Sequence, residues 1–131
     1  MTPRVEAWMR QAESDMAVAR LSAEQGFHSQ ACYHAGQAAE KALKAVLVAA
    51  GSTPPYSHSL DRLVEALADL GFNMGPLRQL HLKALSRMNT ETRYPHGDEA
   101  PADLFDTNDS GPALSMATIV LEHIQSTLAA G

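Results

Sequence analysis

Apolar residues recur every three or four positions along most of this 131-residue chain, with polar residues between them. That spacing matches the turn of an α-helix with one buried face. Alanine and leucine dominate the apolar set, while valine, isoleucine and aromatic residues are few, which favours helix over sheet. The pattern predicts five helices, over about residues 5–24, 29–50, 59–70, 76–92 and 112–128.

Glycine and proline mark the ends of these segments. A glycine follows each of the first three helices, at Gly26, Gly51 and Gly71. Pro54-Pro55 enforces an extended link before the third helix, whose amides Ser59 is placed to cap. Residues 96–111 are rich in Asp, Pro and Gly, so we expect a loop there that is mobile at its centre.

The chain shows no internal repeat, low-complexity tract or interdomain linker. Its length suits one domain with a core of its own. We therefore predict a single all-α domain over residues 1–131, an up-and-down antiparallel four-helix bundle with an additional fifth helix. Small residues on the second helix allow close approach of another helix, from this chain or from a second copy: Ala35, Ala38, Ala39 and Ala42.

The net charge is −5, which disfavours indiscriminate binding along nucleic-acid backbones. The charges are unevenly distributed, because residues 41–96 hold seven basic and four acidic side chains and the remainder three basic and eleven acidic. A basic centre in an acidic chain suits a small phosphate-bearing ligand. No apolar run reaches the length of a membrane span or a signal-peptide core. With Cys32 as its lone cysteine, the protein is expected in the reducing cytoplasm.

One face of the second helix carries Gln37, Lys41 and Lys44, which are spaced i, i+4, i+7. The lysines could hold a phosphate as point charges while Gln37 fixes a base or sugar. The alternative is structural: Glu40 and Lys44 form the favourable i, i+4 order of a surface ion pair, which is worth a few tenths of a kcal/mol.

Three further residues extend this candidate ligand site. His58 precedes a helix start, where it could bond exposed amides or lean toward the second helix. Arg93 ends the fourth helix, where an arginine complements the helix dipole but also suits a phosphate. Tyr94 offers a ring for stacking.

Metal and nucleophilic chemistry find little support in the sequence. The six histidines are dispersed, without the pairs that zinc or di-iron helices carry, so we predict neither a metal nor a cofactor. Cys32 falls in an apolar-leaning helix, where a buried, inert thiol is expected.

The order of these landmarks resembles the HEPN family, small helical domains found alone or beside minimal nucleotidyltransferases. The resemblance rests on Trp8, Asp15, Phe27–Tyr33, Gln37–Lys44, His58-Ser59-Leu60 and Arg93-Tyr94-Pro95. It implies a helical bundle, commonly a homodimer. The implied roles are nucleotide binding, partnership with a nucleotidyltransferase of a toxin–antitoxin type, or RNA cleavage as a toxin.

Ribonuclease members of the family carry an arginine followed, after four to six residues, by a histidine. No arginine here has a histidine at that separation, since eight residues separate Arg87 from His96 and two separate Arg93 from His96. The departure disfavours cleavage, which needs a proton-transferring histidine and a phosphate-binding arginine in one pocket.

Three functions remain open on this sequence. The first and preferred one is a non-catalytic nucleotide-binding module that partners a separate nucleotidyltransferase, with Gln37, Lys41, Lys44, His58, Arg93 and Tyr94 at the ligand. The second is a metal-independent ribonuclease toxin that uses Arg87 or Arg93 with His96. The third is a ligand-free interaction protein, in which the exposed remainder of the alanine stripe forms a dimer or partner-helix contact.

Overall fold

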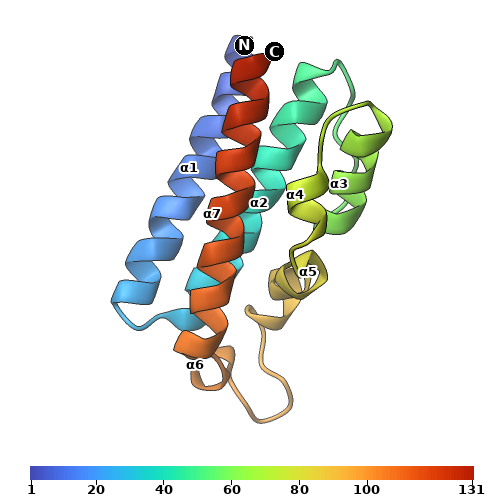
Figure 1. Cartoon of the computed structure of the whole chain (residues 1–131). Helices are drawn as coiled ribbons and strands as arrows, with labels where there is room; N and C mark the ends of the chain where they lie inside the picture. The colour runs from blue at the N-terminus through green and yellow to red at the C-terminus, as the bar shows by residue number, and fades with distance from the viewer.

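The computed structural model describes all 131 residues as a set of seven helices with no β-sheet (Figure 1). No helix combines the length and the apolar character needed to cross a membrane. The helices are α1 (Pro3–Glu24), α2 (His28–Ala49), α3 (Leu60–Asp69), α4 (Gly75–Arg78), α5 (Leu82–Glu91), α6 (Pro101–Leu104) and α7 (Thr107–Ala130).

The three long helices α1, α2 and α7 pack side by side and form the centre of the fold (Figure 1). At one end, Nδ1 of His28 lies 2.9 Å from Oγ of Ser110, which joins the starts of α2 and α7. At the other end, Val46 and Leu128 line the same hollow as Val5 near the start of α1. Helices α2 and α7 are therefore parallel, and α1 runs antiparallel to both.

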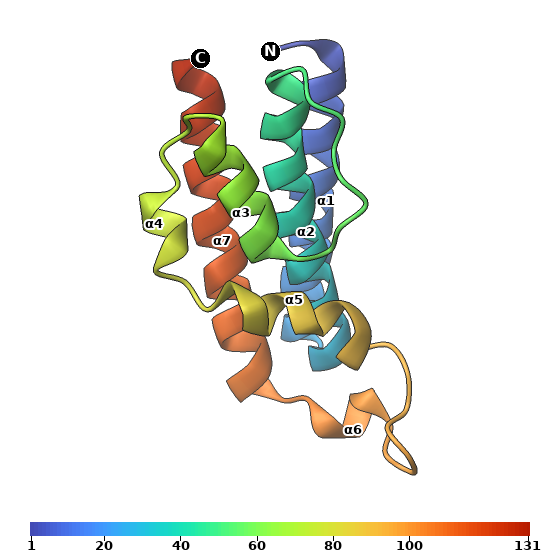
Figure 2. The ribbon, with the colours of Figure 1, turned by 90° about the vertical axis from the view of Figure 1, so that its right-hand side faces the viewer.

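A second group of helices, α3, α4 and α5, covers one side of this centre (Figure 2). The link over residues 50–59 carries the chain back along α2. At the end of the link, His58 contacts Glu40. Phe72, which follows α3, lies near Val46 in the second half of α2. Helix α3 is thus parallel to α2. The predicted all-α class is confirmed, but the helices do not simply alternate in direction, because this extended link returns the chain before α3 begins.

The alanine stripe of α2 is completely covered within the chain. Ala35, Ala38, Ala39 and Ala42 are each 0% exposed, with α1 and α7 packed against α2. A Cβ at Gly36 would lie 3.4 Å from the carbonyl oxygen of Leu85, so α5 approaches the backbone of α2 at this point. Small residues therefore serve packing inside the chain, and these four alanines offer no exposed remainder to a second copy.

The first three predicted helices are confirmed, with ends that differ from the expected positions by only a few residues. The glycines that follow them have the left-handed φ values of helix-ending residues, 84° for Gly26, 79° for Gly51 and 95° for Gly71. Ser59 is the N-cap of α3, but the prediction that its side chain caps the helix amides was wrong. Its hydroxyl donates to Asp61 (2.7 Å), and the amide of Leu60 donates to Ser86 (2.9 Å).

The fourth predicted helix, 76–92, was wrong as one element. The chain leaves helical geometry between Arg78 and Leu82, which separates α4 from α5. Helix α4 packs against α7, whereas α5 crosses α2, so one straight helix could not make both contacts (Figure 2).

The predicted start of the last helix at Pro112 was also wrong. Helix α7 begins at Thr107, where Asp106 and Asp109 form a capping box, and the expected loop holds the short helix α6. Pro112 lies inside α7 but near its start, so its missing N–H removes one bond from the first turns only. Mobility of the remaining loop stays a prediction.

Candidate functional site

Both lysines of the predicted site hold a carboxylate partner. Nζ of Lys41 on α2 donates to Asp15 on α1, and Nζ of Lys44 donates to Glu40 one turn earlier (3.1 Å). Asp15, Glu40 and Lys44 are buried. The structural interpretation of Glu40 and Lys44 as an i, i+4 pair is confirmed, but the pair lies in the interior rather than on the surface.

His58 leans toward α2, one of the two orientations that its position allowed. Its Nδ1 lies 2.7 Å from Oε1 of Glu40, so this carboxylate bonds both the imidazole and the lysine. An ionised carboxylate only accepts hydrogen bonds, hence Nδ1 carries the proton. The ring is on the link before α3, and its side chain is 56% exposed.

Lys44 and His58 lie at the wall of a hollow of about 480 Å³ between the start of α1 and the link, which we call the Trp8 hollow. Its lining residues are Arg4, Trp8, Lys44 and residues 53–58, including Tyr56 and His58. A smaller hollow of about 360 Å³ adjoins it and shares Arg4 and Trp8, with Lys41 in its lining. Arg4 and Trp8 are one turn apart on α1 and therefore share a face.

The Trp8 hollow is basic and has aromatic walls. Arg4 is exposed and forms no ion pair, whereas Lys44 and His58 share the single carboxylate of Glu40. The indole of Trp8 is half-buried, and the ring of Tyr56 is fully exposed. Cationic donors beside aromatic faces can hold a phosphate and stack a nucleobase.

The other three predicted residues form a separate group further along α2, the tyrosine cluster of Tyr33, Gln37, Asn89, Arg93 and Tyr94. Nε2 of Gln37 donates to Oδ1 of Asn89 (2.8 Å), and Nε of Arg93 donates to the carbonyl of the same residue (2.7 Å). The guanidinium carbon of Arg93 lies 5.3 Å from the ring centroid of Tyr33 and 5.5 Å from that of Tyr94. These are cation–π distances.

The six predicted ligand residues therefore divide into two groups. Gln37 is bonded to Asn89 in the tyrosine cluster, whereas Lys44, about 10 Å further along the axis of α2, is bonded to Glu40 at the Trp8 hollow. Lys44 and His58 lie at the Trp8 hollow, Lys41 lies at the adjoining one, and Gln37, Arg93 and Tyr94 belong to the tyrosine cluster.

The candidate nuclease residues lie at the end of α5. Nε2 of His96 is 2.8 Å from the carbonyl oxygen of Glu91, and Nε of Arg87 is 3.8 Å from a carboxylate oxygen of the same residue. Arg93 is engaged with the tyrosine cluster instead. Each of these three side chains, of Arg87, Arg93 and His96, therefore has a partner within the chain.

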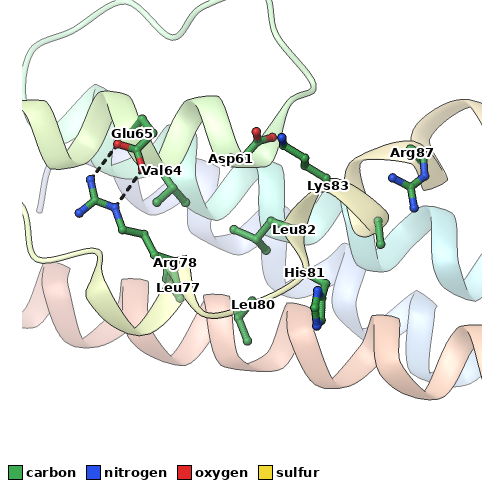
Figure 3. Close-up of a pocket in the computed structure, with 11 residues that line it drawn as sticks. Asp61, Val64, Glu65, Leu77, Arg78, Leu80, His81, Leu82, Lys83 and Arg87 are labelled. Atoms are coloured by element: carbon green, nitrogen blue, oxygen red, sulfur yellow. Dashed lines mark hydrogen bonds and ion pairs between the residues drawn. The ribbon is translucent and has the colours of Figure 1, made fainter.

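A further hollow of about 490 Å³ lies between α3, α4 and α5 (Figure 3). Arg78 donates two hydrogen bonds to Glu65, and the side chains of Asp61 and Lys83 point toward one another. The Ser59 hydroxyl lowers the pKa of the Asp61 carboxyl, and Lys83 lowers it further. The charges here are largely compensated, and Arg87 is the one candidate site residue that lines this hollow.

Cys32 is buried on α2, in agreement with the prediction of an inert thiol. Burial, with a smaller contribution from Asp109, raises its pKa to about 12. A thiol that stays protonated is a poor nucleophile. No three His, Cys, Asp or Glu side chains lie close enough together to hold a metal ion.

Sequence reasoning missed Arg4, Tyr56 and Asn89. The i, i+4 spacing of Arg4 and Trp8 was a signal that could have placed both on one face. Tyr56 could have been associated with His58 two residues later. Asn89 gave no such signal, because its contact with Gln37 spans 52 positions.

Comparison with known proteins places the chain in a family. The family model of the HEPN domain matches residues 5–127. Among solved structures, TT1696 from Thermus thermophilus is 29% identical with a TM-score of 0.82, over 96% of this chain and 99% of that one. ST0689, an archaeal HEPN homologue, is 24% identical with a TM-score of 0.72, over 95% of this chain and 98% of that one. No curated protein matches the sequence. The family model covers nearly the whole chain, and the chain therefore belongs to the HEPN family.

Proposed function

We propose that this HEPN protein is a non-catalytic module that binds a nucleotide in the Trp8 hollow. The observation that carries the proposal is the lining of that hollow, where Arg4, Lys44 and His58 meet beside Trp8. The basic groups would hold the phosphate, and the indole would stack the base. Burial of Lys44 strengthens such an interaction, because screening by water and salt is reduced there.

The remaining predicted residues would contact the rest of the ligand. Lys41, in the adjoining hollow, would hold a second phosphate or the sugar. Gln37, Arg93 and Tyr94 lie further along α2 and would reach only an elongated ligand. The residues that a nuclease would need are engaged elsewhere, because His96 bonds a backbone carbonyl and Arg93 is stacked on two rings. This also supports binding rather than cleavage.

In this proposal the protein acts in the cytoplasm as a homodimer and as the partner of a separate minimal nucleotidyltransferase, in a toxin–antitoxin type of pair. Its HEPN membership supports the proposal, because the partnership is one of the roles that the family resemblance implies. The dimer would use surfaces other than the covered alanine stripe. Sedimentation of the purified protein, alone and with a minimal nucleotidyltransferase, tests both associations.

Isothermal titration calorimetry with ATP and GTP tests the binding proposal. Arg4→Ala should weaken binding about tenfold, because it removes one charged contact to phosphate and breaks no ion pair in the protein. Lys44→Ala should abolish binding, with circular dichroism to verify that the helices persist. Arg10→Ala is the matched control, since Arg10 is exposed on the same helix and lines neither hollow. No binding at millimolar nucleotide, or equal losses in Arg4→Ala and Arg10→Ala, would overturn the proposal.

A further inference from the structure

We propose that the Trp8 hollow selects a terminal phosphomonoester, and that binding places a proton on His58. The inference rests on the proposed nucleotide site and assigns its ligand class and its dependence on pH. It follows from the two ring nitrogens of His58, which have different surroundings.

Nδ1 of His58 is committed to Glu40, as the donor of a 2.7 Å hydrogen bond. Nε2 makes no hydrogen bond within the protein, and the half-exposed ring lines the hollow. When the ring is neutral, Nε2 therefore carries a lone pair, which repels a phosphate oxygen. When the ring is protonated, Nε2–H becomes a charged donor to that oxygen. An ionised phosphate oxygen can thus accept a hydrogen bond from Nε2 only when the ring is protonated.

The net charge of the groups around His58 determines which ligand charge the hollow compensates. Arg4 lines the hollow from α1, Lys44 lines it from α2, and the phenol of Tyr56 lines it from the link. Glu40 on α2 bonds both Lys44 and His58. Asp61 at the start of α3 is held by Ser59. Two cations and one carboxylate leave a single positive charge while His58 is neutral, and two when it is protonated. A terminal phosphomonoester is a dianion at neutral pH, which matches the protonated state, whereas a phosphodiester is a monoanion.

Proton uptake separates this inference from nucleotide binding itself. The full-length protein is titrated with AMP and with cyclic AMP at pH 7.5 in Hepes and in Tris, whose ionisation enthalpies differ. If binding places a proton on the ring, AMP should bind with net uptake of protons, seen as a difference between the binding enthalpies in the two buffers. Its affinity should fall from pH 7 to pH 8.5, because protonation of the ring becomes less favourable. Cyclic AMP is a monoanion that matches the hollow while His58 is neutral, so it should bind about tenfold more weakly and without proton uptake.

Two variants assign the proton to His58. His58→Gln should remove the proton uptake and bring the affinities for AMP and cyclic AMP together. His58→Lys carries a permanent charge, so it should bind AMP with an affinity that does not change between pH 7 and pH 8.5. Circular dichroism verifies that both variants keep their helices.

The outcomes distinguish the two proposals. AMP binding without proton uptake, uptake that persists in His58→Gln, or equal affinity for AMP and cyclic AMP would each overturn the inference and leave the nucleotide site standing. Failure of AMP, cyclic AMP and ATP to bind at millimolar concentration would overturn the proposed function together with the inference.

Discussion

The ammonium group of Lys44 lies 3.1 Å from the carboxylate of Glu40 on the same helix, and the two side chains are only 11% and 8% exposed. An ion pair at this depth has lost most of its hydration, so each charge depends on the other for compensation. Lys44 also forms part of the wall of the Trp8 hollow, which connects the stability of α2 with the proposed site.

Removal of Glu40 should therefore destabilise the protein strongly. We expect Glu40→Ala to lower the free energy of unfolding by about 3 kcal/mol, because Lys44 is left buried without a counter-charge. Urea denaturation followed by circular dichroism measures the change. The matched control is Glu65→Ala, which breaks the exposed ion pair with Arg78 and should cost much less. Equal losses in the two variants would contradict this account of the pair.

The contact between α2 and α5 at Gly36 predicts a size-dependent response. A Cβ would lie 3.4 Å from the carbonyl oxygen of Leu85, so alanine fits there. Gly36→Ala should be neutral or stabilising by up to about 1 kcal/mol, since alanine is the better helix former. Gly36→Leu should destabilise by about 1–3 kcal/mol, because its side chain displaces α5. Thermal unfolding of both variants checks the order, and a leucine variant as stable as the alanine one would refute it.

Cys32 should be unreactive in the folded protein. Burial raises the pKa of its thiol from 9.0 to about 12, so almost no thiolate forms at pH 8. We expect a disulfide reagent such as DTNB to modify Cys32 only after unfolding in urea. Rapid modification of the native protein would show that the thiol is accessible.

The raised pKa of Cys32 also predicts that the stability of the protein changes with pH in the alkaline range. The folded state retains the thiol proton above pH 9, whereas the unfolded state loses it, so stability falls as pH rises toward 12. Between pH 8 and pH 10 the loss should be about 1 kcal/mol greater in the native sequence than in Cys32→Ala. If the free energy of unfolding changes equally with pH in the two proteins, ionisation of Cys32 does not cause the loss of stability.

The proposed binding role predicts that the purified protein does not cleave RNA. His96 bonds the carbonyl of Glu91, and the nearest candidate arginines, Arg87 and Arg93, each have partners of their own. Incubation with single-stranded RNA in the presence of a chelator provides the assay. Cleavage that disappears in His96→Ala would instead establish the ribonuclease alternative.

The parts of the fold that were predictable are those encoded by neighbouring residues. Helical spacing and the glycines at 26, 51 and 71 located the first three helices. The break between α4 and α5 was missed because no proline or glycine marks it; it follows from packing of the two segments on different helices. The start of α7 was missed because Pro112 suggested a first turn, although Asp106 and Asp109 form the cap upstream.

The candidate site was predictable in its residues on α2 and in His58, but not in its arrangement. The face with Gln37, Lys41 and Lys44 was visible from spacing, but its division into two groups depends on contacts distant in sequence. Asp15 contacts Lys41 across 26 positions, and His58 contacts Glu40 across 18. The second contact exists because the link turns back along α2, a path that local patterns do not encode.

The antiparallel pairing of α1 and α2 has a consequence for the order of folding. These helices are consecutive, joined by a short turn, and share a long interface, whereas the contacts of α7 with both must close much longer loops (Figure 1). Local contacts of this kind form fastest, so we expect the α1–α2 hairpin to nucleate folding and α7 to dock later. Arg4, Trp8, Asp15, Glu40, Lys41 and Lys44 all belong to this hairpin. The α1 and α2 walls of the proposed site are therefore expected to assemble with the earliest contacts, before α7 is in place.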